Sequence, residues 1–338
     1  MHNSTPTKQT KSLCVAVAVG SVARSKRQQL LQLLADGESF DALASYLSES
    51  ELRTAHEILE LCQERSIEIL PYTSDRYPAG LRATGSPPAA LYVRSHAERF
   101  VFPQRIVSVV GTRAASVEMC QRASLLSLQL AQGGLCVVSG LALGIDGAAH
   151  RGALTAATLS STIAVVAHGL DRVYPASHSR LADSIVERGG ALVSEYPPGT
   201  EPFKHHFLER NRIIAGLSLG VVVVQAGERS GSLVTAHYAA DFGRDVFVLE
   251  GADGDNGFLG GARLIEDGAI PIAGAREILE EYGVTIAEKG GDFSSSWQTL
   301  SLPEYLEKTG CSASQMLRLE MEGRVIRLPG NKVSVMLG

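Results

Sequence analysis

Hydrophobic residues follow two different spacings along the chain, and the change falls near residue 67. Before that point, apolar residues recur at helical intervals, as the leucines of residues 30–34 do, and this spacing predicts helices over residues 13–65. The apolar run 13–19 follows two lysines, which is a weak signal-peptide pattern. A first buried helix is the preferred interpretation of that run.

From residue 105 onward, short apolar runs alternate with helical stretches at intervals of roughly 25–30 residues, the signature of strand–helix–strand units. The pattern predicts an α/β domain with an extended Rossmann-like, doubly wound sheet, whose ligands bind at the carboxyl ends of the strands. The runs that suit buried parallel strands are 106–110, 135–138, 163–167, 191–193, 221–224 and 246–249, with 270–272 as one more.

Three further segments complete the predicted organisation of domains. Residues 1–66 form an N-terminal helical domain, and residues 67–287 form the Rossmann-like domain, with 67–94 interpreted as a bridge into it. Residues 288–297 are rich in glycine and serine and are interpreted as a linker. Residues 298–338 read as helix, helix and hairpin, the winged-helix pattern.

The last unit carries little charge of the kind that DNA recognition needs. Its second predicted helix, 312–322, holds one basic residue, Arg318, against Glu320 and Glu322. A helix of that charge suits a major groove poorly. Protein contact or simple packing is at least as good an interpretation of this unit as DNA reading.

Net charge, cysteine spacing and missing motifs argue against a general DNA-coating protein, a disulfide-linked or zinc-binding protein, and several classes of enzyme. The formal net charge of −5 means that a nucleic-acid site must be a local patch on an acidic body. The five cysteines are widely spaced without a C-x-x-C pair, which predicts neither disulfides nor zinc and favours a reducing, cytoplasmic location. Known nucleotide-hydrolase and metalloprotease motifs are missing, so we expect no metal, no cofactor and no catalytic residues.

Two of the predicted strands end in glycine-containing turns that suit an anion. Gly111 allows a close backbone approach after the first strand, and Arg113 can form a forked pair of bonds with one phosphate. The turn after the second strand, residues 139–150, contains Ser139, Gly140 and Gly144 before a helix, which predicts a phosphate nest. An ordinary turn explains the first pattern too. Asp146 and His150 of the second turn are interpreted as a helix cap and a core histidine, in preference to catalytic roles.

A third segment, residues 204–212, concentrates positive charge within an acidic protein. Lys204, Arg210 and Arg212 surround the aromatic ring of Phe207, and phosphate contacts beside a stacking ring are typical of single-stranded nucleic-acid binding. A solvated helix face is the alternative. One of the arginines is also expected to pair with Glu195.

The fourth turn, residues 226–232, is small and polar and leads into a helix. It completes the rim of one shared groove, although a plain loop explains it equally well. The DNA-contacting candidates are therefore Gly111, Arg113, Ser139, Gly140, Gly144, Lys204, Phe207, Arg210, Asn211, Arg212, Ser230, Gly231 and Ser232.

Taken in order, the motifs of residues 70–280 resemble the DprA/Smf family of DNA-processing proteins. The resemblance is carried by V-V-G-T-R, S-G-L-A-x-G-I-D-x-x-A-H, G-L-D-x-x-Y-P, S-E-Y-P-P-G, F-x-x-R-N-R-I-I-A-G-L-S and S-G-S-L-V-T-A. Three positions depart from the family pattern: Leu208 and Glu250 replace prolines, and Gly261-Ala262-Arg263 replaces Gly-Thr-Asn.

The resemblance implies a non-enzymatic, homodimeric protein that binds and protects incoming single-stranded DNA. It further implies loading of the RecA recombinase during natural transformation and recombination. It also implies that the N-terminal helices form a SAM-like or helix-hairpin-helix domain. The alternatives are a Rossmann-like nucleotide sensor and a nucleotide hydrolase of the same broad superfamily.

Overall fold

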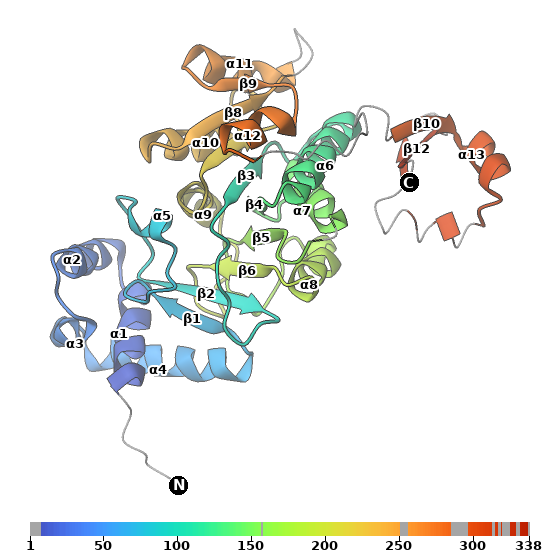
Figure 1. Cartoon of the computed structure of the whole chain (residues 1–338). Coiled ribbons are helices and arrows are strands. Elements are labelled where there is room, and N and C mark those ends of the chain that lie inside the picture. The colour runs from blue at the N-terminus through green and yellow to red at the C-terminus, as the bar shows by residue number, and fades with distance from the viewer. Residues whose placement is uncertain are drawn as a thin grey trace.

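A nine-stranded sheet forms the centre of the main domain in this computed structural model (Figure 1). The structure describes residues 8–156, 158–250, 256–284, 297–312, 315–316, 319, 325–328 and 332–336. No helix in these described segments is long and apolar enough to cross a membrane.

Seven strands of this sheet are parallel and lie in the order β6-β5-β4-β3-β7-β8-β9. The chain first moves outward on one side of β3 and then returns to build on the other side, so β3 and β7 form the topological switch point. These seven strands confirm the predicted ones within two or three residues at each end. Their bounds are β3 (Ile106–Val110), β4 (Cys136–Ser139), β5 (Thr162–Val165), β6 (Ala191–Ser194), β7 (Gly220–Val223), β8 (Asp245–Leu249) and β9 (Ile270–Ile272).

Residues 67–94, interpreted as a bridge into the Rossmann-like domain and counted as part of it, supply two strands of the sheet itself. β1 (Glu68–Pro71) pairs antiparallel with β2 (Ala90–Ser95), and β2 pairs antiparallel with β6. A short apolar run does not reveal which strand it will pair with, so the sequence could indicate the strands without indicating this edge.

Helices cover both faces of the sheet because strand residues point alternately to each side. In β3, Ile106 and Val110 pack toward α9 and α10, whereas Val107 and Val109 pack toward α6 and α7. The first face carries α5 (Ala79–Arg82), α9 (Lys204–Leu217), α10 (Gly231–Asp241) and α11 (Leu259–Glu266). The second carries α6 (Val117–Gln132), α7 (Ile145–Thr155), α8 (Ser179–Glu187) and α12 (Ala275–Glu281).

The N-terminal helices have a hydrophobic core of their own, which rests on β1 and β2. The apolar run 13–19 lies in its first helix, and Val17 and Val19 are fully buried, which confirms the buried helix. Ser48 and Glu51 form a reciprocal capping box at the start of the last long helix. The elements are α1 (Lys8–Ser21), α2 (Arg24–Ala35), α3 (Phe40–Leu43), η1 (Ala44–Tyr46) and α4 (Glu49–Glu64).

The C-terminal segment forms a small antiparallel sheet with the strand order β10-β12-β11. Its hairpin strands confirm the prediction, and so does the helix after residue 301. The linker residues 288–296, the hairpin turn and most of the second predicted helix lie outside the described residues, and the winged-helix class stays a prediction. The bounds are β10 (Trp297–Ser301), α13 (Leu302–Thr309), β11 (Val325–Leu328) and β12 (Lys332–Met336).

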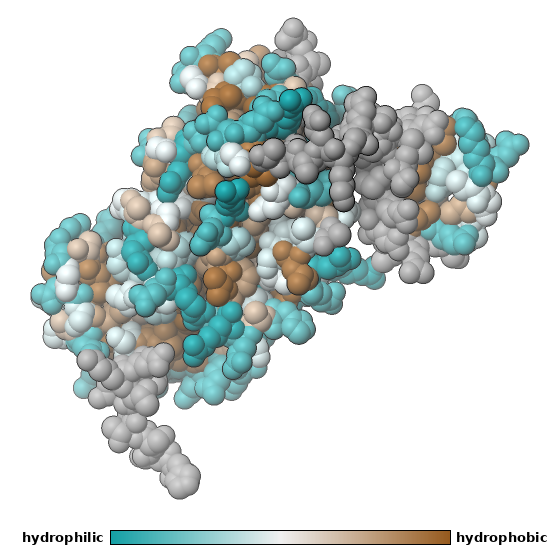
Figure 2. Space-filling model, in the orientation of Figure 1, coloured by the Kyte–Doolittle hydropathy of each residue, from teal (hydrophilic) through white to brown (hydrophobic). Residues whose placement is uncertain are grey.

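Polar residues cover much of the face drawn in Figure 2, and hydrophobic residues show through mainly near the centre of the molecule. This distribution is ordinary for a globular protein, whose apolar atoms always contribute part of the exposed surface.

The contact between α6 and α7 depends on one glycine. A Cβ atom at Gly152 would overlap the backbone carbonyl of Ser124 on α6. Gly152→Ala should therefore push the two helices apart and lower the free energy of unfolding by about 1–3 kcal/mol. Chemical denaturation measures the loss. Gly20→Ala is the matched control, because its Cβ would meet no atom within 4 Å, and it should stabilise α1 slightly.

Candidate functional site

A groove of about 320 Å³ opens at the carboxyl ends of β3 and β7, at the switch point of the sheet. It draws residues from all four predicted turns, which confirms that the fold brings these turns together. The lining comprises Val110, Gly111, Thr112, Arg113, Ala142, Asp146, Phe207, Leu208, Arg210, Asn211, Ile214, Arg229, Ser230, Gly231, Ser232 and Thr235.

Backbone contacts hold three of the turns together. The Thr112 N–H donates to the carbonyl oxygen of Gln225 at 2.9 Å, and the Thr112 carbonyl accepts from the N–H of Ile145 at 3.3 Å. Gly111 is required here because a Cβ would lie 2.6 Å from the Ile145 side chain. Gly144 has a φ of +75°, and a Cβ atom there would overlap the Thr112 carbonyl oxygen, so the second turn also requires glycine at this position. These two glycines shape the groove but do not themselves show anion binding.

A cation and two aromatic rings form one cluster at the groove, with Phe207 half-buried between two exposed side chains. The guanidinium carbon of Arg113 lies 4.8 Å from the ring centroid of Phe207. The ring of Tyr174 lies 5.7 Å from Phe207 on a tilted plane. Arg113 is exposed and Tyr174 is 46% exposed. The cluster therefore offers both charge and ring surface to a ligand.

The second turn does not contain the open phosphate nest that the sequence predicted. Its Gly140 N–H donates to Asp146 Oδ2 at 3.1 Å, and the Ala142 N–H donates to the same oxygen at 3.4 Å. The buried Ser139 hydroxyl donates to the Val109 carbonyl at 2.6 Å. Asp146 thus fills the nest with its own carboxylate instead of capping the helix, and Ser139 and Gly140 are not free to bind a phosphate.

Arg210 is part of the floor of the groove and not one of its exposed cations, contrary to the prediction of a direct phosphate contact. It is 3% exposed and donates through Nη1 to the carbonyl oxygens of Gly140, at 2.9 Å, and Val165. Burial lowers the pKa of Arg210 to about 10, and the nearby Asp146 opposes that shift. Burial raises the pKa of Asp146, while Arg210 and the two N–H donors lower it. At neutral pH the guanidinium keeps its charge and binds the loop beneath the groove.

The two residues after Arg210 are also occupied within the protein. Arg212 forms a salt bridge with the buried carboxylate of Glu195, which confirms the expected pairing of one arginine with that residue and corrects the predicted DNA contact of Arg212. The Asn211 amide donates to the Gly231 carbonyl at 3.1 Å and so joins α9 to the start of α10. The Arg212 guanidinium is therefore not a free cation for a ligand, and the neutral Asn211 amide is engaged although Asn211 still lines the groove.

The remaining predicted residues lie at the edges of the groove. Ser230 caps α10 by accepting from the N–H of Ser232, and the two hydroxyls also share a hydrogen bond of 2.7 Å. Lys204 is exposed at the first turn of α9 and does not line the groove. Arg229 lines the groove and is exposed, although it was not among the predicted residues. Its place in the fourth predicted turn, directly before Ser230, could have indicated this role.

His150 is the core histidine that the sequence predicted. Its side chain is fully buried, and Nδ1 lies 2.7 Å from the Thr162 hydroxyl. Burial, with smaller effects from His178 and two arginines, lowers the pKa of His150 to about 3. The imidazole is therefore neutral at physiological pH.

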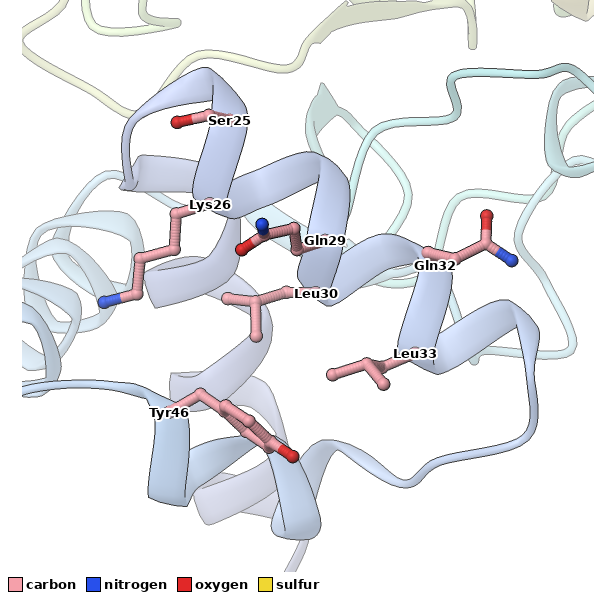
Figure 3. A pocket seen from close by; sticks show the side chains of 7 residues that line it. All are labelled: Ser25, Lys26, Gln29, Leu30, Gln32, Leu33 and Tyr46. Atoms are coloured by element: carbon pink, nitrogen blue, oxygen red, sulfur yellow. The ribbon is translucent and has the colours of Figure 1, made fainter.

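A second hollow lies in the N-terminal helical domain. Figure 3 shows Leu30 and Leu33 of α2 directed toward the space beside Tyr46. Lys26 is the single charged residue among those that line it, and its ammonium group is paired with Glu51 at 2.7 Å. The hollow thus lacks the free positive charge of the groove in the main domain.

A mostly parallel sheet with a groove at its switch point, lined by two exposed arginines and the ring of Phe207, defines a Rossmann-like protein. The chain belongs to the DprA/Smf family, because residues 68–283 match the model of DNA recombination-mediator protein A. It is 39% identical to Protein Smf of Escherichia coli over 290 residues, which cover 78% of this chain and 76% of that protein.

Other relatives agree with this assignment. The DNA processing protein DprA of Bacillus subtilis is 39% identical over 224 residues, covering 66% of this chain and 74% of that protein. The structure of DprA from Streptococcus pneumoniae matches 79% of this chain and 95% of its own, with a TM-score of 0.66 and 33% identity. DNA processing protein A from Helicobacter pylori, described for its single-stranded DNA binding mode, matches 64% of this chain and 95% of its own, with a TM-score of 0.56 and 28% identity.

The three departures from the family pattern have different positions relative to the groove. Leu208 lines it and is 50% exposed. Ala262 lies in α11, and the Glu250 carbonyl accepts a hydrogen bond from Arg122 at 2.6 Å. Only Leu208 among the three thus borders the groove.

Stability should fall in acid because the fold holds His150 neutral. Its folded pKa of about 3 is below the ordinary 6.5, so its contribution is complete above pH 6.5 and is lost as the pH falls toward 3. Each unit of pKa difference corresponds to about 1.4 kcal/mol. Urea unfolding from pH 7 to pH 4 should show a shallower decline for His150→Gln than for the wild type, with the exposed His96→Gln as the control. Equal declines in all three proteins would contradict this role.

Proposed function

We propose that the groove binds single-stranded DNA without catalysing a reaction. The observation that carries the proposal is the cluster of Arg113, Phe207 and Tyr174 at the switch point. An exposed guanidinium suits a phosphate, and an aromatic ring suits an unpaired base of any sequence. A base in a duplex is already stacked and paired, so this combination favours a single strand.

The placement of positive charge supports the same ligand. The chain has a formal net charge of −5, yet Arg113 and Arg229 are exposed at the groove, and Lys204 lies just outside it. Lys204 is also at the N-terminal end of α9, whose first turn holds no acidic residue. A cation there opposes the helix dipole, and such a local cost is typical of a functional position.

The buried polar groups support binding in preference to catalysis. The carboxylate of Asp146 is bound by two backbone N–H groups and lies beside Arg210. Two donors to one oxygen of this buried carboxylate fit a structural role for it better than the role of a general base. His150 is buried away from solvent and bonded to Thr162. Both groups act as structural supports under the groove.

We further propose that the bound strand is protected and passed to the RecA recombinase during natural transformation, and that the protein acts as a homodimer. Membership of the DprA/Smf family supports these roles, and the Helicobacter pylori relative described for its single-stranded DNA binding mode supports the choice of DNA strand. A cytoplasmic location is expected for a protein with these partners.

A salt titration tests the groove directly. Labelled single-stranded and double-stranded oligonucleotides of one length are titrated with the protein at several salt concentrations. We expect a preference for the single strand and a steep loss of affinity with salt. Arg113→Ala should reduce the slope of log affinity against log salt by about one unit, because one phosphate contact is lost. Lys204→Ala should behave similarly if the strand extends past the start of α9.

Arg105→Ala is the matched control for this titration. Arg105 is exposed and immediately precedes β3, at the end opposite Arg113. It should leave both the affinity and the slope unchanged. An equal effect of the Arg105 and Arg113 variants would show that net charge, and not the groove, governs binding. Binding of a free nucleotide that excess single strand does not displace would favour the nucleotide-sensor alternative.

Loading of RecA is tested separately on DNA that is covered by a single-strand binding protein. Wild-type protein should shorten the delay before RecA hydrolyses ATP on this DNA. Arg113→Ala should shorten it several-fold less at equal protein concentration, because loading requires the bound strand. An undiminished effect of the variant would separate RecA loading from the groove.

A further inference from the structure

Two exposed aromatic side chains flank the groove without lining it. Tyr174 follows β5 in the loop before α8 and touches Phe207, as described above. Phe203 lies at the start of α9, is 55% exposed, and precedes Phe207 by four residues. Phe203 is the N-cap of α9, one helical turn before Phe207, and its own ring packs on His205 and His206. Tyr174 therefore contacts the one ring that lines the groove, and Phe203 lies one turn of α9 away from that ring.

The rings are held in place by the backbone beneath them. The Gly169 N–H donates to the Thr200 carbonyl at 3.0 Å, and the Gly199 N–H donates to Asp171 Oδ1 at 2.7 Å. Arg172 bonds both Asp171 and Glu201. These contacts join the loop that carries Tyr174 to the segment that carries Phe203, so neither ring stands on a free loop.

Phe203 is part of a stack of rings at the surface. Its plane is 11° from that of His205, with 6.0 Å between the centroids, and His206 packs against it edge-on at 5.4 Å. His206 in turn stacks on the buried Tyr196 at 4.1 Å. His206 thus links the exposed ring of Phe203 to the buried ring of Tyr196.

The ring of Phe207 is already partly covered. The Arg113 guanidinium lies over it, and Tyr174 packs against it at an angle. A strand that reaches this point needs other ring surfaces for its next bases. Tyr174 is an exposed ring in contact with Phe207, and Phe203 is an exposed ring one turn before it on α9.

We propose that Tyr174 and Phe203 form an aromatic track that stacks bases of the single strand beyond the groove, an inference that rests on the function proposed above. The charges agree with this ligand. Lys204 follows Phe203 directly, and Arg113 lies beside Phe207. The carboxylates of Asp171 and Glu201 form salt bridges with Arg172, which offsets their repulsion of a phosphate. Sequence tolerance follows because every base has a face that can stack.

Two oligothymidylates of equal length, about 15 nucleotides, test the track. One carries all its bases, and the other carries bases only in a short central stretch with abasic residues on both sides. Their phosphates are the same, so a difference in affinity reports contacts to the outer bases. Wild-type protein should prefer the complete strand by about five- to 30-fold, the range that stacking of one or two bases gives.

The double variant Tyr174→Ala with Phe203→Ala should bind the two strands equally and should bind the abasic-flanked strand as the wild type does. The pair Tyr174→Phe with Phe203→Tyr keeps both rings and should keep the preference. Tyr46→Ala removes a ring that is 57% exposed in the N-terminal domain (Figure 3) and should also keep it. Thermal unfolding checks that each variant is folded.

A double variant that retains the wild-type preference would overturn the track. So would a wild-type protein that binds both strands equally well, although single-strand binding in the groove would then stand. Failure of the wild type to bind either strand would overturn the proposed function itself.

Discussion

The groove depends on one buried interaction, the contact of Arg210 with the loop after β4. Its guanidinium donates to the Gly140 carbonyl and lies beside Asp146, whose carboxylate accepts the Gly140 N–H. There is no space for a side chain at Gly140, because a Cβ atom would lie 2.5 Å from Arg210 Nη2 and 2.6 Å from Asp146 Oδ2 and would overlap both. A buried charge is costly unless it is paired and hydrogen-bonded. The loop is therefore held in the shape that presents the Gly140 carbonyl and the Asp146 carboxylate to the arginine.

This arrangement separates the charged residues into two groups with different roles. Arg210 and Asp146 neutralise each other in the floor, whereas Arg113 and Arg229 remain exposed at the groove. A fixed floor keeps the rim in one geometry, and the exposed rim supplies the electrostatic attraction. Binding of an anionic strand then requires little rearrangement, which preserves more of the interaction energy as affinity.

Glu195 links α9 to the N-terminal helices. Its carboxylate pairs with Arg212 on α9 and lies 3.9 Å from Arg27 on α2. The helical domain thus contacts the segment that leaves β6 toward α9, the helix that carries Phe207. The helical domain also packs on β1 and β2, and it therefore contacts the main sheet directly, because these strands are part of that sheet. Contacts with both the main sheet and the N-terminal helices therefore help to position α9.

The sequence by itself determined the seven parallel strands, the N-terminal helices and the four turns that meet in the groove, because hydrophobic spacing and glycine position are local properties. It also indicated that His150 is buried and that one arginine pairs with Glu195. Only the tertiary structure decided which cations stay exposed. Arg210 and Arg113 are equally basic in sequence, but burial under the Gly140 loop commits one of them to the fold, whereas the other remains at the surface. Exposure depends on contacts between distant segments, and no local pattern records those contacts.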